Sequence, residues 1–207
     1  LTKGKGLKWV GDGNKETVFA VKFGTQVDWG DQYKLGYSNQ YNLQFGLRAG
    51  NGGESTFPFA QGWGAGPVNG DLWNEWRNAE PNDIRRTASI LDADAELEDY
   101  QWGQDTQMEE TGYWQKKYMP VSAYDEEEEF TVSYAILTDK AKEDYQLAHT
   151  QDLVLIRFAD VLLMHSELSE TATGINRVRA RVDLDPVGYS LAAIKKERRY
   201  ELAFEGV

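Results

Sequence analysis

Three stretches near the C-terminus decide the fold of this chain. They read DLVLIRFADVLLMHSELSE (152–170), GINRVRARVDL (174–184) and AIKKERRYELAFEGV (193–207). Apolar residues recur in them at three- and four-residue intervals, the pattern of a helix with one buried face. Helices joined by short connections bury such stripes on one another. The sequence therefore predicts packed consecutive helices over residues 151–207.

Charged and capping residues in these stretches predict specific contacts. Arg157 and Asp160 lie three residues apart, so we expect them to pair on one helix. Ser190 can cap the third helix, and Gly206 is a candidate C-cap for it. Arg198 shares a helix face with apolar residues, so its guanidinium should either reach solvent or meet a carboxylate.

In order and spacing, these blocks resemble the C-terminal helices of the SusD/RagB family. Upstream, Gly62-Trp63-Gly64 and Asp83-Ile84-Arg85-Arg86-Thr87 resemble a family stretch that ends in D-P-R-R-x-T, with Ile84 in place of the proline. The segment that begins Thr111-Gly112-Tyr113 is similar to the T-G-x-x-x-x-K-Y-x-x-P segment that follows. The resemblance covers most of residues 17–207 and part of the family's usual length. It implies a mainly α fold, a TPR-like α–α superhelix of the SusD type with short β-strands and long irregular loops.

The resemblance also implies a function. SusD/RagB proteins are non-catalytic cell-surface binding proteins that pass oligosaccharide or polysaccharide to a SusC-like TonB-dependent outer-membrane transporter. It implies a location on the extracellular face of the outer membrane of a Gram-negative bacterium, through a lipid anchor outside this chain. Some family members bind peptides, so peptide uptake is the first alternative. No enzymatic activity and no cofactor are expected.

Residues 1–150 form a loop-rich middle region with short strands, and 151–207 form the C-terminal helical scaffold of the same domain. The apolar run 17–23 predicts a buried strand that precedes a long glycine-rich loop. Residues 71–78 predict a short helix with Asp71 as its N-cap, ended by Pro81. Residues 83–87 lead into a predicted strand that runs through Leu91, and residues 130–137 favour a strand.

Composition excludes several functions. The chain has 207 residues and a net charge of −12, which argues against a nucleic-acid partner because phosphates require a basic surface. It contains no cysteine, so disulfides and Cys-ligated metals are excluded. The two histidines, His149 and His165, are isolated and predict neither a metal site nor a catalytic triad. The longest apolar run is interrupted by Arg157 and Asp160, and it is too short and too charged to span a bilayer.

The best candidate for a ligand site is DWGDQYKLGYSNQYNLQ, residues 28–44. Aromatic residues recur there every four positions, with amides and carboxylates between them. Aromatic rings can pack on the flat C–H faces of sugars, while amide and carboxylate groups bond their hydroxyls. The alternative is one helix with an aromatic core stripe, against which Gly30 and Gly36 argue. The predicted ligand-binding residues are Trp29, Tyr33, Tyr37, Tyr41, Asn39 and Trp63.

Trp63 stands in a glycine-rich turn, where it is either an exposed platform or a cover over the core. Trp73 and Trp76, at helical spacing, are expected in the core, and the sequence does not rank Trp102. Abundant Asp and Glu always allow a glycosidase carboxylate pair, but nothing in the sequence singles one out. A glycoside hydrolase is therefore a less favoured alternative, and a purely structural module is the remaining one. No metal site is predicted.

Overall fold

The computed structural model describes residues 14–23, 38–48, 56, 59, 62–98, 100–104, 109–119, 122–125, 130–133, 149 and 151–206. The chain divides into two compact units. Unit 1 holds residues 1–9, 22–70 and 90–153, and unit 2 holds residues 10–21, 71–89 and 154–207. The last boundary lies close to the predicted one at residue 150. Two upstream segments nevertheless join the C-terminal helices in unit 2.

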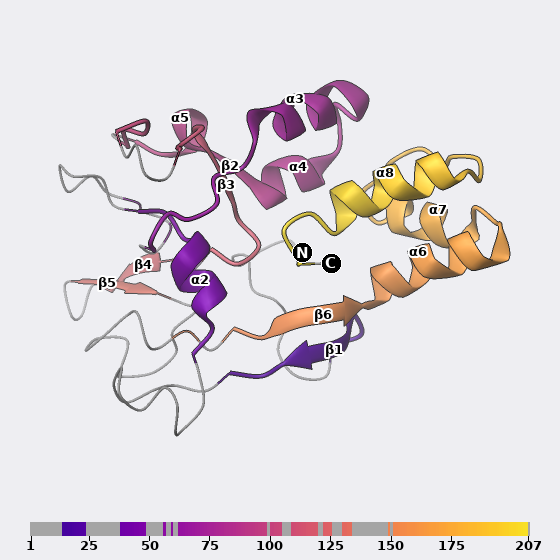
Figure 1. The fold of residues 1–207 in the computed structure, drawn as a ribbon, viewed down its shortest axis with the longest axis horizontal. Helices are drawn as coiled ribbons and strands as arrows, with labels where there is room; N and C mark the ends of the chain where they lie inside the picture. Colours follow the sequence, from indigo (N-terminus) through magenta and orange to yellow (C-terminus); the bar gives the residue numbers. More distant parts are fainter. Residues whose placement is uncertain are drawn as a thin grey trace. The chain divides into compact units, whose positions relative to one another are not determined.

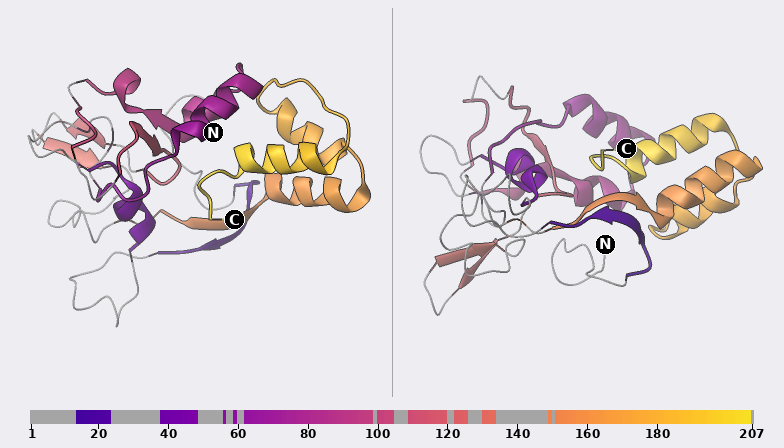
Figure 2. Two further views of the ribbon diagram at one scale, coloured as in Figure 1. Left: turned by 45° about the horizontal axis from the view of Figure 1, so that its top comes forward. Right: turned by 60° about the horizontal axis from the view of Figure 1, so that its bottom comes forward.

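The C-terminal part of unit 2 is helical, as the sequence predicts. Its helices are α6 (Phe158–Ser169), α7 (Thr173–Ala180) and α8 (Leu191–Glu201), and α6 packs against both others. Figures 1 and 2 show the three side by side in every view. Their shared core consists of Ala159, Leu162, Leu163, Ile175, Val178 and Ile194.

The predicted ends of these helices are only partly confirmed. Ser190 caps α8, because its Oγ accepts a hydrogen bond from the backbone N–H of Ala193 at 3.0 Å. The C-cap of α8 is Leu202 and not Gly206, because the helix ends one turn earlier than the predicted cap requires. The predicted helical stretch from residue 151 is wrong at its start, where β6 (Leu153–Arg157) is a strand.

Strand β6 pairs with β1 (Thr17–Val21) in a two-stranded sheet of unit 2. The backbone groups of 153–157 find partners on a segment far upstream, which periodicity within 151–170 cannot reveal. The prediction of a strand near residue 17 is confirmed, but its burial is wrong. Val18 and Phe19 are 57% and 55% exposed, because β1 pairs with β6 alone among the described strands.

The helix α3 (Gly70–Ala79) confirms the predicted helix near residue 71, but Asp71 lies within its first turn and is not the N-cap that the sequence predicted. Trp73 and Trp76 are buried, as expected for a core face. Trp76 stacks on Tyr200 with the ring centroids 4.6 Å apart. Burial and the carboxylate of Glu75 raise the pKa of Tyr200 to about 12.

The strand predicted to follow residues 83–87 starts later than expected, because α4 (Ile84–Ser89) extends into its first residues. Asp83 favours this helix because its carboxylate accepts the backbone N–H of Arg85 at 3.0 Å. The same carboxylate accepts the indole N–H of Trp76 at 2.9 Å. The strand β2 (Ile90–Asp92) follows directly.

Buried ion pairs join segments of unit 2 that lie far apart in the sequence. The guanidinium of Arg85 contacts Asp83 at 2.7 Å, Glu197 at 2.6 Å and Glu201 at 2.7 Å. Burial alone would lower the pKa of Arg85, but the hydrogen bonds that it donates to Asp83 and the three negative charges raise this pKa above its ordinary value. Because all four side chains are buried, removal of one charge would leave its partners uncompensated.

Arg157 belongs to the same network. It contacts Glu201 at 2.5 Å and Glu205 at 2.6 Å. The predicted pair between Arg157 and Asp160 is therefore wrong, because Arg157 ends β6 and points to carboxylates that follow in α8 and beyond it. Asp160 pairs instead with Arg198 at 2.6 Å, which confirms the carboxylate expected beside Arg198.

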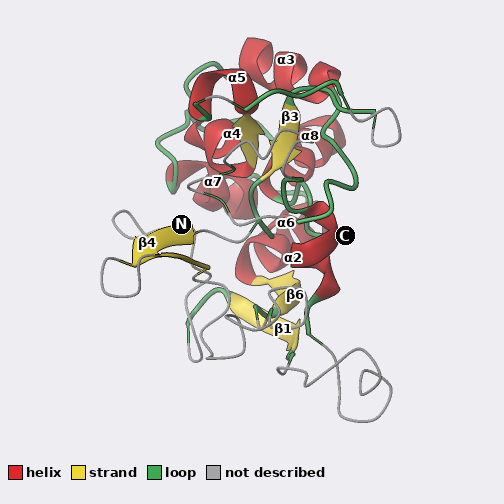
Figure 3. Ribbon diagram, turned by 90° about the vertical axis from the view of Figure 1, so that its left-hand side faces the viewer, coloured by secondary structure: helices red, strands yellow, loops and turns green. Residues whose placement is uncertain are grey.

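Unit 1 has short elements. They are α2 (Gln40–Phe45), β2, α5 (Ala93–Glu96), β3 (Tyr113–Gln115), β4 (Ser122–Asp125) and β5 (Phe130–Ser133). β2 pairs antiparallel with β3, Leu91 opposite Trp114, and β4 pairs antiparallel with β5. Figure 3 shows these strands as short pairs among loops. β5 confirms the start of the strand predicted over 130–137; residues 134–137 lie outside the described residues.

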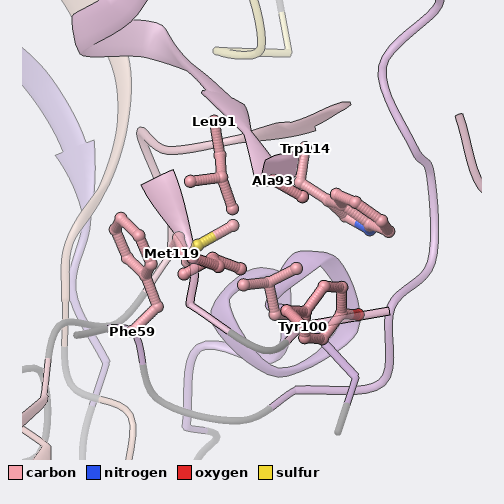
Figure 4. Packing of buried hydrophobic residues seen from close by; sticks show 8 residues of the cluster. Phe59, Leu91, Ala93, Tyr100, Trp114 and Met119 are labelled. Carbon is pink, nitrogen blue, oxygen red and sulfur yellow. The ribbon is translucent and has the colours of Figure 1, made fainter. Parts of the chain in front are cut away.

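The core of unit 1 is a cluster of apolar side chains from several loops and short elements (Figure 4). Its members are Leu47, Phe59, Leu91, Ala93, Leu97, Tyr100, Trp114 and Met119. The rings of Tyr100 and Trp114 meet edge to face at 5.8 Å. Within the described residues of the chain, no helix is long and apolar enough to cross a membrane.

Candidate ligand-binding surface

The described part of the predicted ligand region is built on α2 and the segment 62–65. Backbone N–H groups of this segment bond carbonyls at the end of α2: Trp63 to Leu43 at 2.7 Å and Ala65 to Gln44 at 2.7 Å. These bonds satisfy helix carbonyls that have no partner within α2. They also fix the backbone of Trp63 beside the helix that carries Tyr41.

Glycine is required where the two segments meet. A Cβ at Gly62 would lie 2.6 Å from the Cα of Gly46, and a Cβ at Gly46 would lie 2.8 Å from the carbonyl oxygen of Asn42. No side chain fits between these backbones. Gly62 thus allows its backbone to lie directly against that of Gly46, and this close approach positions the neighbouring Trp63 at the surface.

Two of the predicted aromatic residues present exposed rings in unit 1. Tyr41 is 38% exposed and Trp63 is 39% exposed. Tyr41 is held from below by Phe45, with ring centroids 5.3 Å apart, and by Tyr118, at 5.8 Å. We call Tyr41 and Trp63 the aromatic surface. A ring that is packed on one side and open on the other can take a sugar face without losing much conformational freedom.

Asn39 has a structural role in this region. It is fully buried and is the N-cap of α2, where its Oδ1 accepts the backbone N–H of Tyr41 at 2.9 Å. Its Nδ2 donates to the carbonyl oxygen of Gln151 at 2.7 Å. Both ends of the amide are therefore used inside unit 1, and Asn39 supports Tyr41 from within.

Sequence reasoning missed Phe45 and Tyr118, which position Tyr41. Phe45 continues the four-residue spacing of the aromatic residues, and this spacing could have revealed it. Tyr118 comes from a distant segment and left no such signal. Trp29, Tyr33 and Tyr37 lie outside the described residues.

The interior beneath this region contains His149. It is fully buried, and burial lowers the pKa of its imidazole to about 4. Its carbonyl oxygen accepts the backbone N–H of Asn39 at 2.7 Å. The imidazole is thus neutral near pH 7, and His149 serves the site by holding the N-cap of α2.

Among the described residues, no group of three or more His, Asp or Glu side chains is placed to hold a metal ion. The aromatic surface offers ring faces, and the amide of Gln44 is exposed beside it on α2.

Comparison with known proteins identifies the family of this chain. The sequence model of the SusD family matches residues 15–207. The chain belongs to the SusD family. This confirms the resemblance and, with it, the mainly α fold of the SusD type.

Solved SusD-family structures are similar to this chain. A laminarin-binding SusD-like protein is 28% identical, with a TM-score of 0.70 over 94% of this chain and 41% of its own. Surface glycan-binding protein A from Bacteroides thetaiotaomicron is 21% identical, with a TM-score of 0.72 over 97% of this chain and 42% of its own. The latter has also been solved in complex with laminarihexaose. A comparison with curated proteins gives no match.

The chain thus spans about two fifths of the length of these SusD-family structures. The family match over residues 15–207 spans both the segments that carry Tyr41 and Trp63 and the C-terminal helices.

Proposed function

We propose that this protein captures oligosaccharide or polysaccharide non-covalently, without cleaving it. The ligand would then pass to a SusC-like TonB-dependent transporter at the extracellular face of a Gram-negative outer membrane, where a lipid anchor outside this chain would hold the protein. The observation that carries the proposal is the exposed pair Tyr41 and Trp63 in a SusD-family chain that is 28% identical to a laminarin-binding relative.

The physical basis is the match between aromatic rings and pyranose faces. Tyr41 and Trp63 are each exposed by more than a third and fixed by packing or backbone bonds. Each ring can cover the C–H face of one sugar, while phenol and amide groups bond its hydroxyls. Trp29, Tyr33 and Tyr37, which lie outside the described residues, are proposed as further ligand contacts on the basis of their sequence spacing.

A binding screen tests the proposal. The intact protein is titrated with laminarin, starch, xylan and a peptide pool, and binding is measured by calorimetry. We expect a glycan to bind and the double variant Tyr41→Ala/Trp63→Ala to weaken its binding by at least tenfold, since two ring contacts of about 1 kcal/mol each are lost. Phe19→Ala is the control, because it removes an aromatic residue that is more exposed than Tyr41 and Trp63 but belongs to unit 2.

The other outcomes are informative in different ways. Glycan binding that survives in the double variant would keep the function and move the site, with Trp29→Ala/Tyr33→Ala as the next variant. Binding of peptides alone would replace glycan with peptide as the ligand. Release of shortened sugars on incubation would contradict the absence of cleavage.

A further inference from the structure

Trp102 is a second exposed aromatic residue of unit 1, outside the aromatic surface. Its side chain is 36% exposed. The indole lies directly on the backbone of Gly112, where a Cβ would approach its Cε2 and Cζ2 atoms to 2.8 Å. Its N–H donates to Asp94 Oδ1 at 2.8 Å. One face and the polar edge of the ring are therefore fixed, and the exposed part lies away from Gly112.

The loop that carries Trp102 is also held in place. The backbone N–H of Gly103 donates to Glu110 Oε2 at 2.6 Å, which closes the loop across its base. Gly103 has a φ of +84°, and no described residue lies within 4 Å of its Cβ position. A ring fixed in this way loses little freedom when a ligand covers it.

The groups around Trp102 select the class of ligand. Asp94, Glu98 and Gln101 are exposed neighbours in sequence or contact, and their oxygens accept hydrogen bonds from hydroxyl groups. The negative charges of Asp94 and Glu98 oppose an acidic sugar. Lys116 is buried and paired with Glu96, so it is not presented to a ligand. The site therefore favours a neutral sugar over a uronic acid.

We propose that Trp102 is a second sugar-contact site of unit 1, which takes one neutral pyranose ring of the captured glycan. The proposal rests on the proposed function, because a sugar must bind the protein at all. It adds a contact on a different loop from the aromatic surface. Two contacts on one protein would raise the affinity for a long polysaccharide above that for either contact alone.

Fluorine NMR of the intact protein labelled with fluorotryptophan tests the site directly. The signals are assigned by single Trp→Phe variants, and neutral hexasaccharides (laminarihexaose, maltohexaose and xylohexaose) are titrated in turn. We expect the signal of Trp102 to shift with at least one of them, also in the Tyr41→Ala/Trp63→Ala background. Trp114 is the control, because it is 1% exposed and its signal should not move. An oligogalacturonate should leave the signal of Trp102 unchanged.

Affinity for polysaccharide provides a second measurement. Trp102→Ala should weaken the binding of that glycan's polymer by about threefold to tenfold, while Phe19→Ala, which removes an exposed ring of unit 2, should leave it unchanged. A signal of Trp102 that stays still while that of Trp63 shifts would overturn this inference and leave the proposed function intact. If no tryptophan signal responds to any glycan and calorimetry detects no binding, both fall together. A lower melting temperature of Trp102→Ala with unchanged affinity would show that Trp102 only stabilises its loop.

Discussion

At the scale of single residues, His149 combines complete burial with a titratable ring. Neither ring nitrogen has a hydrogen-bond partner among the described residues. Burial lowers the pKa of the imidazole to about 4 in the folded protein, whereas an unfolded histidine has a pKa of about 6.5. Because protonation favours the unfolded chain, the stability of unit 1 should be complete above pH 6.5 and decline as the pH falls toward 4.

Replacement of His149 by Gln should remove this pH dependence. The wild type should lose up to about 3 kcal/mol between about pH 6.5 and pH 4 through this group, and His149→Gln should lose correspondingly less over that range. Urea denaturation at a series of pH values measures the difference. His165→Gln is the control, because His165 is exposed on α6 and its removal should leave the slope unchanged. Equal slopes for wild type and His149→Gln would contradict the burial of a neutral imidazole.

At the scale of elements, the close approach of α6 and α7 depends on one glycine. A Cβ at Gly174 would lie 2.0 Å from the carbonyl oxygen of Leu162 and 2.7 Å from Ser166 Oγ. Ser166 Oγ accepts the backbone N–H of Ile175 at 2.8 Å, so the two helices are also joined by a hydrogen bond. The obstacle is mostly backbone, which cannot move aside cheaply.

Gly174→Ala should therefore destabilise unit 2 by about 2 to 3 kcal/mol, although alanine usually stabilises a helix relative to glycine. Chemical denaturation followed by circular dichroism measures the change. Gly188→Ala is the matched control: nothing lies within 4 Å of its Cβ position. This variant should be neutral or more stable by up to about 1 kcal/mol. An equal effect of both substitutions would mean that α6 and α7 are not in close contact.

At the scale of the whole molecule, the net charge of −12 separates the possible ligands. A neutral glycan that binds through ring faces and hydroxyl groups should be nearly indifferent to salt, because no charges are neutralised on binding. A charged peptide should respond to screening. We expect the dissociation constant for glycan to change less than twofold between about 20 mM and about 500 mM NaCl.

Calorimetry at the two salt concentrations measures this. A cationic peptide from the pool serves as the comparison, because salt should weaken its attraction to this acidic chain. A glycan affinity that falls steeply with salt would contradict binding through aromatic and uncharged groups, and would point to an ionic ligand.

The SusD-type helices could be predicted from the sequence because their signals are local. Apolar spacing within each stretch gave α6, α7 and α8, and Ser190 marked the start of α8. The burial of Trp73 and Trp76 followed from a spacing of three on one helix. The family also followed from short blocks in fixed order, since such blocks need no knowledge of contacts.

Only the tertiary structure decided which residues meet. Arg157 pairs with Glu201, and Arg85 pairs with Glu197 and Glu201. These partners lie far apart in the sequence, so the spacing of residues within one segment could not predict the pairs. A charge that leaves water is compensated by the carboxylates that folding brings to it, so Arg85 contacts the distant Glu197 and Glu201 as well as Asp83, two residues before it.

The candidate sugar contacts divide in the same way. The sequence indicated that Tyr41 and Trp63 belong to a ligand-contact region, and this stays a prediction, but it did not show that Asn39 is buried or that Trp102 lies on Gly112. The residue type determines which groups a side chain can contact or hydrogen-bond. Whether its ring or amide faces solvent depends on the backbone packed against it, and that backbone comes from elsewhere in the chain.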